Sequence, residues 1–209
     1  MIDPANPVLA EVWRGTLTES RHRGAIAVCD AGGRLHAAWG DVERPVYPRS
    51  AIKPLQALPL VESGALDAFG LGEAELALAC ASHSGETMHV EPVRDWLRRL
   101  GLGPDDLACG PQPPTHGPSR RALQRAGEAP GSLHNNCSGK HASFLTLARH
   151  RGDPVAGYEQ PEHPVQQAWI GVLSELTGVD PQATGTDGCG IPVRALGLRA
   201  TAQAMARLA

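Results

Sequence analysis

Two places in the sequence pair a nucleophile with a lysine three positions later, Ser50 with Lys53 and Cys137 with Lys140. Residues at i and i+3 share one face of a helix, so each pair can meet where its segment begins a helix. A neutral lysine amine can take the proton of a serine hydroxyl, which makes Ser50 and Lys53 a candidate pair for nucleophilic catalysis. Lys53 can act as this base only if burial or nearby cations lower its pKa from about 10.4. Taken alone, the S-x-x-K spacing also fits a helix-capping serine followed by a solvated lysine.

Another hydroxyl, that of Ser82, stands in the turn Ala81-Ser-His-Ser-Gly-Glu86, which follows an apolar stretch. A serine in such a turn can face a pocket, which makes Ser82 a second candidate for hydroxyl chemistry. The same residues also fit a capping role at the start of the next helix, together with Glu86. The turn alone does not decide between the two roles.

Cys189 lies in a glycine-flanked turn, two residues after Asp187. Two thiolates and a nitrogen can hold zinc with one position left for water, so Cys137, Lys140 and Cys189 form a candidate ligand set. The lysine would have to lose its proton to bind a metal. The alternative is that both cysteines are inert buried side chains, because their spacing is not that of a zinc finger.

The elements that must position these residues are predicted as strands first and helices afterwards, an α+β arrangement. Strand patterns are followed by helical patterns, and the glycine and proline content of 24 and 18 residues predicts many specified turns. The sequence shows no internal repeat, so a single domain over residues 1–209 is the simplest prediction. The predicted strands are Leu9–Thr18, Gly24–Cys29 and Arg34–Trp39, and the predicted helices are Ile52–Ser63, Glu73–Ala81, Val90–Leu100, Ser119–Ala126, His141–His150, Val165–Leu176 and Val193–Leu208.

Composition excludes several classes of function. The 209 residues are 42% hydrophobic and 20% charged, with a formal net charge of −3, which is typical of a soluble globular protein. Without a basic stripe we expect no nucleic acid partner, and without a long apolar run we expect no membrane partner. Five widely spaced cysteines form a poor disulfide framework and, with no signal-peptide pattern at the start, predict a cytoplasmic protein.

Four segments together resemble the L-asparaginases of the rhizobial type, also called class 3. They are Tyr47–Pro54, Ala81–Glu86, His134–His141 and Gly185–Pro192, and the run HNNCSGKHASFL is the most specific. The resemblance implies a fold similar to serine β-lactamases and glutaminases. It also implies a homodimer that hydrolyses L-asparagine to L-aspartate and ammonia.

The resemblance assigns roles to individual positions. It implies that Ser50 and Lys53 are a catalytic tandem and that Ser82 is the second catalytic serine. It further implies a zinc ion held by Cys137, Lys140, Cys189 and a water molecule, with the acidic side chain of Asp187 beside the metal. We expect Arg49, next to the nucleophile, to bind the substrate α-carboxylate through its forked guanidinium.

The sequence departs from the family at its C-terminal end. Relatives are expected to continue further, and the lysine that partners their second serine belongs to that stretch, so the fold is expected to lack the family's C-terminal part. One alternative is therefore a truncated, inactive zinc-binding paralogue or fragment that binds a ligand or partner. Another is a glutaminase or other Ser-Lys amidohydrolase, since one methylene separates the two substrates. The S-D-N and K-T-G motifs of β-lactamases are absent from the sequence.

Overall fold

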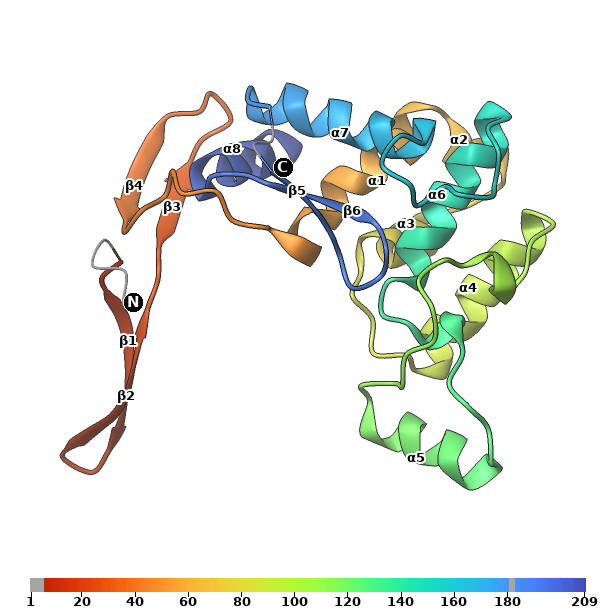
Figure 1. Ribbon diagram of the computed structural model, residues 1–209, viewed down its shortest axis with the longest axis horizontal. Helices are drawn as coiled ribbons and strands as arrows, with labels where there is room; N and C mark the ends of the chain where they lie inside the picture. Colours follow the sequence, from red (N-terminus) through yellow and green to blue (C-terminus); the bar gives the residue numbers. More distant parts are fainter. Residues whose placement is uncertain (1–5, 181–182) are drawn as a thin grey trace. The chain divides into compact units, whose positions relative to one another are not determined.

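The computed structural model describes residues 6–180 and 183–209, in which short antiparallel strand pairs are followed by helices (Figure 1). This confirms the α+β class. The chain forms two compact units. The first lies within residues 1–48, 174–184 and 194–209, and the second comprises residues 49–173 and 185–193. Whether one domain spans the chain stays a prediction.

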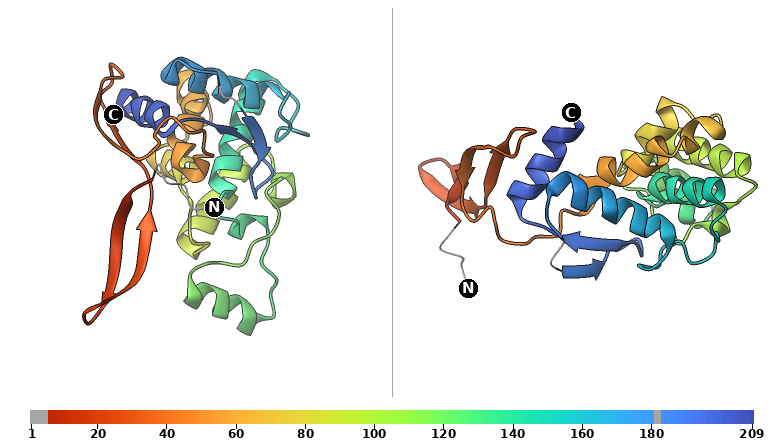
Figure 2. Two further views of the ribbon diagram at one scale, coloured as in Figure 1. Left: turned by 60° about the vertical axis from the view of Figure 1, so that its left-hand side comes forward. Right: turned by 90° about the horizontal axis from the view of Figure 1, so that it is seen from above.

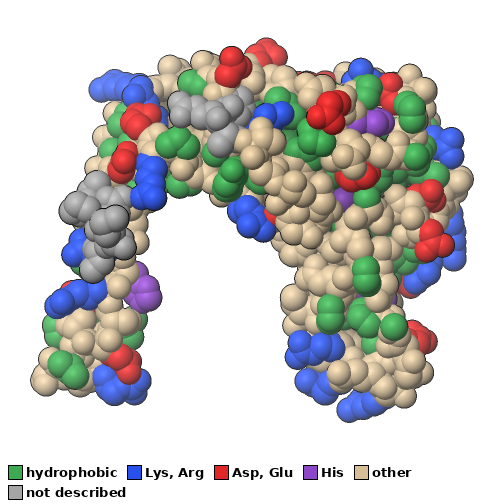
Figure 3. Space-filling model, viewed as in Figure 1, with side chains coloured by type: hydrophobic (Ala, Val, Ile, Leu, Met, Phe, Trp, Pro, Cys, Tyr) green, Lys and Arg blue, Asp and Glu red, His purple; other side chains and the backbone are tan. Residues whose placement is uncertain are grey.

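The first unit begins with a two-stranded ribbon of β1 (Val8–Arg14) and β2 (Leu17–Arg23), which pair antiparallel. The single strand predicted over Leu9–Thr18 is therefore wrong, because the chain reverses at Gly15, whose φ of 60° suits a glycine. Both faces of the ribbon are exposed, and the Trp13 and Leu17 side chains are 58% and 72% exposed. Hydrophobic side chains are visible on this ribbon in Figure 3.

The rest of the first unit packs a second hairpin against a helix. Strands β3 (Ile26–Cys29) and β4 (Leu35–Trp39) pair antiparallel, as the sequence predicts for these residues. Helix α8 (Leu198–Leu208) packs on β3, where the Cys29 thiol donates to the Arg199 carbonyl at 3.7 Å.

The second unit is a group of helices around α6, drawn in turquoise in Figures 1 and 2. Every residue from Ser138 to Ala148 of α6 is buried, which is typical of a central helix with no solvent face. The predicted helices in this unit are confirmed to within a few residues. Its elements are η1 (Arg49–Ile52), α1 (Lys53–Glu62), α2 (Ala65–Ala68), α3 (Glu73–Cys80), α4 (Thr87–Arg99), η2 (Pro104–Asp106), α5 (Gly117–Ala126), η3 (Ser132–His134), α6 (Ser138–Arg151) and most of α7 (Pro164–Thr177).

A close helix contact fixes the beginning of α6. A Cβ atom added at Gly139 would lie 2.3 Å from the Leu78 carbonyl oxygen of α3, so only glycine allows this approach. The Trp96 side chain of α4 is fully buried and donates from Nε1 to Thr146 of α6 at 2.8 Å. Together these contacts hold α3, α4 and α6 in one core, with the start of α6 beside the end of α3.

The last hairpin pairs β5 (Ala183–Thr186) with β6 (Pro192–Ala195), and its tip, residues 185–193, belongs to the second unit. The helix predicted over Val193–Leu208 is therefore partly wrong, because its first residues pair as a strand and the helix begins at Leu198. Among the described residues, no helix combines the length and apolar character needed to cross a membrane.

Candidate active site

Lys53 is a buried amine at the start of α1, with only 1% of its surface exposed. Pro54 follows it in the first turn, where the missing N–H of a proline costs no helical hydrogen bond. The Lys53 Nζ atom donates to the Ala81 carbonyl at 2.5 Å and to the Asn136 carbonyl at 3.4 Å, and it lies 2.9 Å from Ser82 Oγ. Burial lowers the pKa of Lys53, and the positive charge of Lys140 lowers it further.

The structure thus brings together Lys53 and Ser82, although the sequence analysis assigned these two residues to different pairs. Ser50 lies in the 3₁₀ turn η1 just before α1, and its side chain is exposed. Among the hydrogen bonds of the described residues, none joins Ser50 to Lys53. The Ser50–Lys53 tandem therefore stays a prediction, whereas the Lys53–Ser82 contact is a feature of the fold that the sequence did not indicate.

His83 holds the turn that carries Ser82. The His83 backbone N–H donates to the Asn136 carbonyl at 3.2 Å, and its Nδ1 accepts from the Gly85 N–H at 3.1 Å. Because Nδ1 is an acceptor, the neutral ring carries its hydrogen on Nε2, which lies 2.8 Å from Ser138 Oγ. Burial lowers the pKa of His83 to about 4. Sequence analysis gave this histidine no role, and the Ser-His-Ser run was its only signal.

Two thiols and a second buried lysine form a polar cluster at the start of α6. Cys137, Lys140 and Cys189 are 5%, 2% and 5% exposed. The Lys140 Nζ atom donates to Cys189 Sγ at 3.1 Å. The neighbouring Cys137 thiol and the positive charge of Lys140 hold the pKa of the Cys189 thiol well below its usual value. The predicted ligands therefore meet, although 49 residues separate Lys140 from Cys189.

This cluster fits a zinc ion in the chemistry of its donors, because thiolate sulfur and nitrogen are the ligands that zinc prefers. Within the described parts of the chain, no three His, Cys, Asp or Glu side chains have the arrangement of a metal site. A metal at this cluster would therefore need the Lys140 amine as its third protein ligand. The amine would bind it only in its neutral form.

Arg49 and Asp187 form an ion pair near the same turn. The Arg49 Nη2 and Asp187 Oδ1 atoms lie 2.5 Å apart, and the Gly188 N–H also donates to Asp187 at 2.8 Å. Arg49 has a φ of 52°, the only positive value among the described non-glycine residues. Such backbone strain costs about 1–3 kcal/mol and is concentrated at functional sites. The strained residue here immediately precedes Ser50.

A cavity of about 220 Å³ unites these groups. Five predicted site residues line it. Two more contact its wall, Lys53 at Asn136 and Lys140 at Cys189, and Ser82 lies behind the wall against Lys53. Asn136 and Gln112 were missed by sequence analysis, although Asn136 lies within the HNNCSGKH run. The predicted residues that line the cavity are Arg49, Ser50, Cys137, Asp187 and Cys189.

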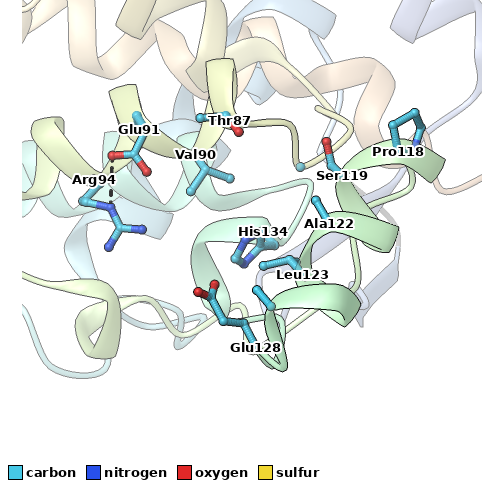
Figure 4. A pocket seen from close by; sticks show the side chains of 12 residues that line it. Thr87, Val90, Glu91, Arg94, Pro118, Ser119, Ala122, Leu123, Glu128 and His134 are labelled. Carbon is cyan, nitrogen blue, oxygen red and sulfur yellow. Dashed lines mark ion pairs between the residues drawn. The ribbon is translucent and has the colours of Figure 1, made fainter.

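A larger cavity of about 520 Å³ lies between α4, α5 and η3 (Figure 4). Its lining includes the Arg94 side chain, which pairs with Glu91 at 3.3 Å, and the His134 ring. No thiol lines this cavity. The smaller cavity has residues with hydroxyl, thiol and carboxylate groups together in its lining and is therefore the candidate active site.

The family model described as L-asparaginase II matches residues 10–209. The match includes all four motif segments, three of which line the smaller cavity. A search of curated proteins gives no match for this chain.

Proposed function

The chain belongs to the L-asparaginase II family, the rhizobial-type L-asparaginases, and from this premise we propose that it hydrolyses L-asparagine to L-aspartate and ammonia. The observation that carries the proposal is Lys53, a buried amine 2.9 Å from a serine hydroxyl and behind the wall of a cavity that contains a second one. Two backbone carbonyls, of Ala81 and Asn136, can take the two hydrogens of a neutral amine. The nitrogen lone pair is then left for a serine proton.

We place the nucleophile at Ser50, because this residue lines the cavity and directly follows the strained Arg49. As Ser50 Oγ bonds to the amide carbon of the substrate, its proton passes to Lys53 by way of the Ser82 hydroxyl, which lies 2.9 Å from the lysine nitrogen. The tetrahedral intermediate then breaks its C–N bond, and the departing nitrogen takes a proton from Lys53 through the hydroxyl of Ser82. Ammonia leaves behind an aspartyl ester on Ser50, which water cleaves to aspartate and free enzyme.

The Arg49–Asp187 ion pair supplies complementary charges for the amino acid part of the substrate. A guanidinium binds a carboxylate through two parallel hydrogen bonds, so Arg49 would hold the α-carboxylate. The Asp187 carboxylate, whose side chain is 13% exposed, would accept the α-ammonium group. An α-amino acid amide is therefore the substrate class that matches the charges of this cavity.

Cys137, Lys140 and Cys189 would hold a zinc ion. When bound, the ion would supply positive charge beside the cavity and order the two turns that carry the cysteines. The catalytic hydroxyls and Lys53 are not among these ligands. We therefore expect the serine and lysine residues, and not the thiols, to form and break the covalent bonds.

A second arrangement is favoured by one specific observation, the direct contact between Lys53 and Ser82. In it, Ser82 attacks the substrate and Ser50 assists. The two arrangements differ in which serine carries the aspartyl ester. Rapid acid quenching during turnover, followed by peptide mass mapping, would assign the ester to the peptide with Ser50 or to the peptide with Ser82.

The function is tested by ammonia release from L-asparagine and from L-glutamine by the zinc-loaded chain. We expect the Ser50→Ala and Lys53→Met variants to lose turnover while remaining folded. Ser63→Ala is the matched control, because Ser63 caps the opposite end of α1. A folded, zinc-loaded chain that released no ammonia from either amide would refute the proposal and leave the inactive, ligand-binding paralogue.

The family also motivates three further proposals, namely a fold similar to serine β-lactamases, a homodimer and a cytoplasmic location. The placement of Ser50 just before α1, after the antiparallel strands, supports the first. Light scattering of the purified chain would test the second.

A further inference from the structure

Gln112 is a polar side chain in the wall of the candidate active site, and no step of the proposed reaction uses it. It lies in the middle of a loop, residues 109–116, that we call the strap. Pro111 precedes it, and Pro113 and Pro114 follow it. A proline fixes its own φ and restricts the residue before it to extended backbone, so the strap has few alternative conformations around Gln112.

Both ends of the strap are held by the turns that carry the proposed chemistry. At the first end, the Asn135 side chain donates from Nδ2 to the Cys109 carbonyl at 2.9 Å and to the Gly110 carbonyl at 3.2 Å. At the other end, the His116 backbone N–H donates to the Ser84 carbonyl at 3.2 Å. Asn135 belongs to the HNNCSGKH run and Ser84 to the turn with the second serine of the mechanism, so the strap has a fixed place beside both.

The orientation of the Gln112 amide follows from one backbone contact. Its Oε1 atom accepts the Asn136 N–H at 3.3 Å, and only the oxygen of a carboxamide can accept such a hydrogen. The Nε2 group, with its two hydrogens, is therefore the other branch of the amide. It takes part in no hydrogen bond among the described residues, and Gln112 lines the cavity of about 220 Å³. The cavity thus has a side-chain donor in its wall that a ligand can use.

Other donors in the lining are already in use. The Cys137 backbone N–H donates to Asn135 Oδ1 at 2.9 Å, and the Gly188 backbone N–H donates to Asp187 Oδ1 at 2.8 Å. Arg49, the cation of the lining, has its Nη2 atom 2.5 Å from the same Asp187 oxygen. A carboxylate has two oxygens and about four acceptor sites, so a substrate carboxylate at Arg49 would still have room for a further donor.

We propose that Gln112 supplies that donor and that its Nε2–H binds the α-carboxylate of the amino acid amide, beside Arg49. The proposal rests on the proposed function and adds a specificity-determining residue to it. By holding the carboxylate with two side chains, the cavity would select amides that carry an α-carboxylate over simple amides. A hydrogen bond to a charged group changes affinity by about tenfold or more.

Two variants of Gln112 separate this contact from a role in holding the strap. Gln112→Glu keeps an oxygen for the Asn136 N–H but replaces the donor with a second, negatively charged oxygen, whereas Gln112→Met removes both groups. We expect KM for L-asparagine to rise about tenfold or more in each, with kcat nearly unchanged. A wild-type KM for Gln112→Glu, with a raised KM for Gln112→Met, would assign Gln112 to the strap alone and overturn the proposal. Gln124→Glu, at an exposed position of α5, is the matched control and should leave KM unchanged.

A shortened substrate tests which oxygen Gln112 binds. β-Alaninamide is L-asparagine without its α-carboxylate, so the variant and the missing group should act on the same contact. In Gln112→Glu, kcat/KM should fall about tenfold or more for L-asparagine and should not fall for β-alaninamide. An equal fall for both amides would mean that Gln112 contacts another part of the substrate and would contradict the proposal.

Binding of the product separates this proposal from the proposed function. L-Aspartate keeps the α-carboxylate, so its dissociation constant in titration calorimetry should rise about tenfold or more in Gln112→Met. If the wild type bound L-aspartate but released no ammonia, the proposed activity would fail, and this comparison would still decide the role of Gln112. If it bound neither L-asparagine nor L-aspartate, both proposals would fall.

Discussion

Acidification is expected to destabilise the chain through His83, the buried histidine that holds the Ser82 turn. Burial lowers its pKa from 6.5 to about 4, and the nearby positive charges of His89, Lys53 and His134 act in the same direction. Protonation would also remove the acceptor for the Gly85 N–H. Folding therefore requires the neutral ring.

The sign follows from proton binding. Between pH 6.5 and 4 the unfolded chain protonates His83 and the folded chain does not, so stability is complete above pH 6.5 and falls as the pH falls towards 4. One pKa unit corresponds to about 1.4 kcal/mol, so the free energy of unfolding should fall by about 3 kcal/mol through this group. Below pH 4 both states are protonated and this contribution stops changing.

The assay is urea unfolding from pH 7 to pH 4, followed by the fluorescence of the buried Trp96 and Trp169. Other groups also titrate in this range, so the comparison is with His83→Gln, which should lose about 3 kcal/mol less than the wild type on acidification. His150→Gln, at an exposed position of α6, should behave as the wild type. Parallel pH curves for wild type and His83→Gln would refute the reasoning.

Three further predictions follow from the same contacts. Because Lys53 must be neutral to act as a base and burial lowers its pKa below 10.5, kcat/KM for ammonia release should rise with pH through that lowered pKa, and Lys53→Met should lose at least about 100-fold at every pH. Arg49→Lys keeps the charge but not the forked contact with Asp187, so KM for L-asparagine should rise about tenfold with kcat nearly unchanged. Gly139→Ala places a methyl group 2.3 Å from the Leu78 carbonyl, and urea unfolding should show a loss of about 2 kcal/mol or more.

The fold class and most helices could be predicted because local patterns decide them. The end of α6 at Gly152, with a φ of 74°, is consistent with the glycine in the sequence, whereas its burial on all sides includes the polar residues Lys140 and His141 and does not follow from an apolar pattern. The two errors have a different cause. The turn at Gly15 interrupts a stretch with continuous strand character, and Val193 joins a strand only because β5 pairs with it. Pairing between strands is a tertiary effect that a local pattern does not contain.

The candidate site, like the fold, could be predicted only in part. The motifs indicated which residues carry chemistry, because hydroxyls, thiols and lysines in glycine-bounded turns are unusual in a packing role. They did not indicate which residues contact one another. Lys53 contacts Ser82, 29 positions away, and His141 contacts Tyr158, 17 positions away. The Lys53–Ser82 contact follows from α1, α3 and α6 packing against one another, and Gly139 permits the approach of α3 to α6. A substitution that separates these helices should therefore displace Ser82 from Lys53 and leave the sequence motifs themselves intact.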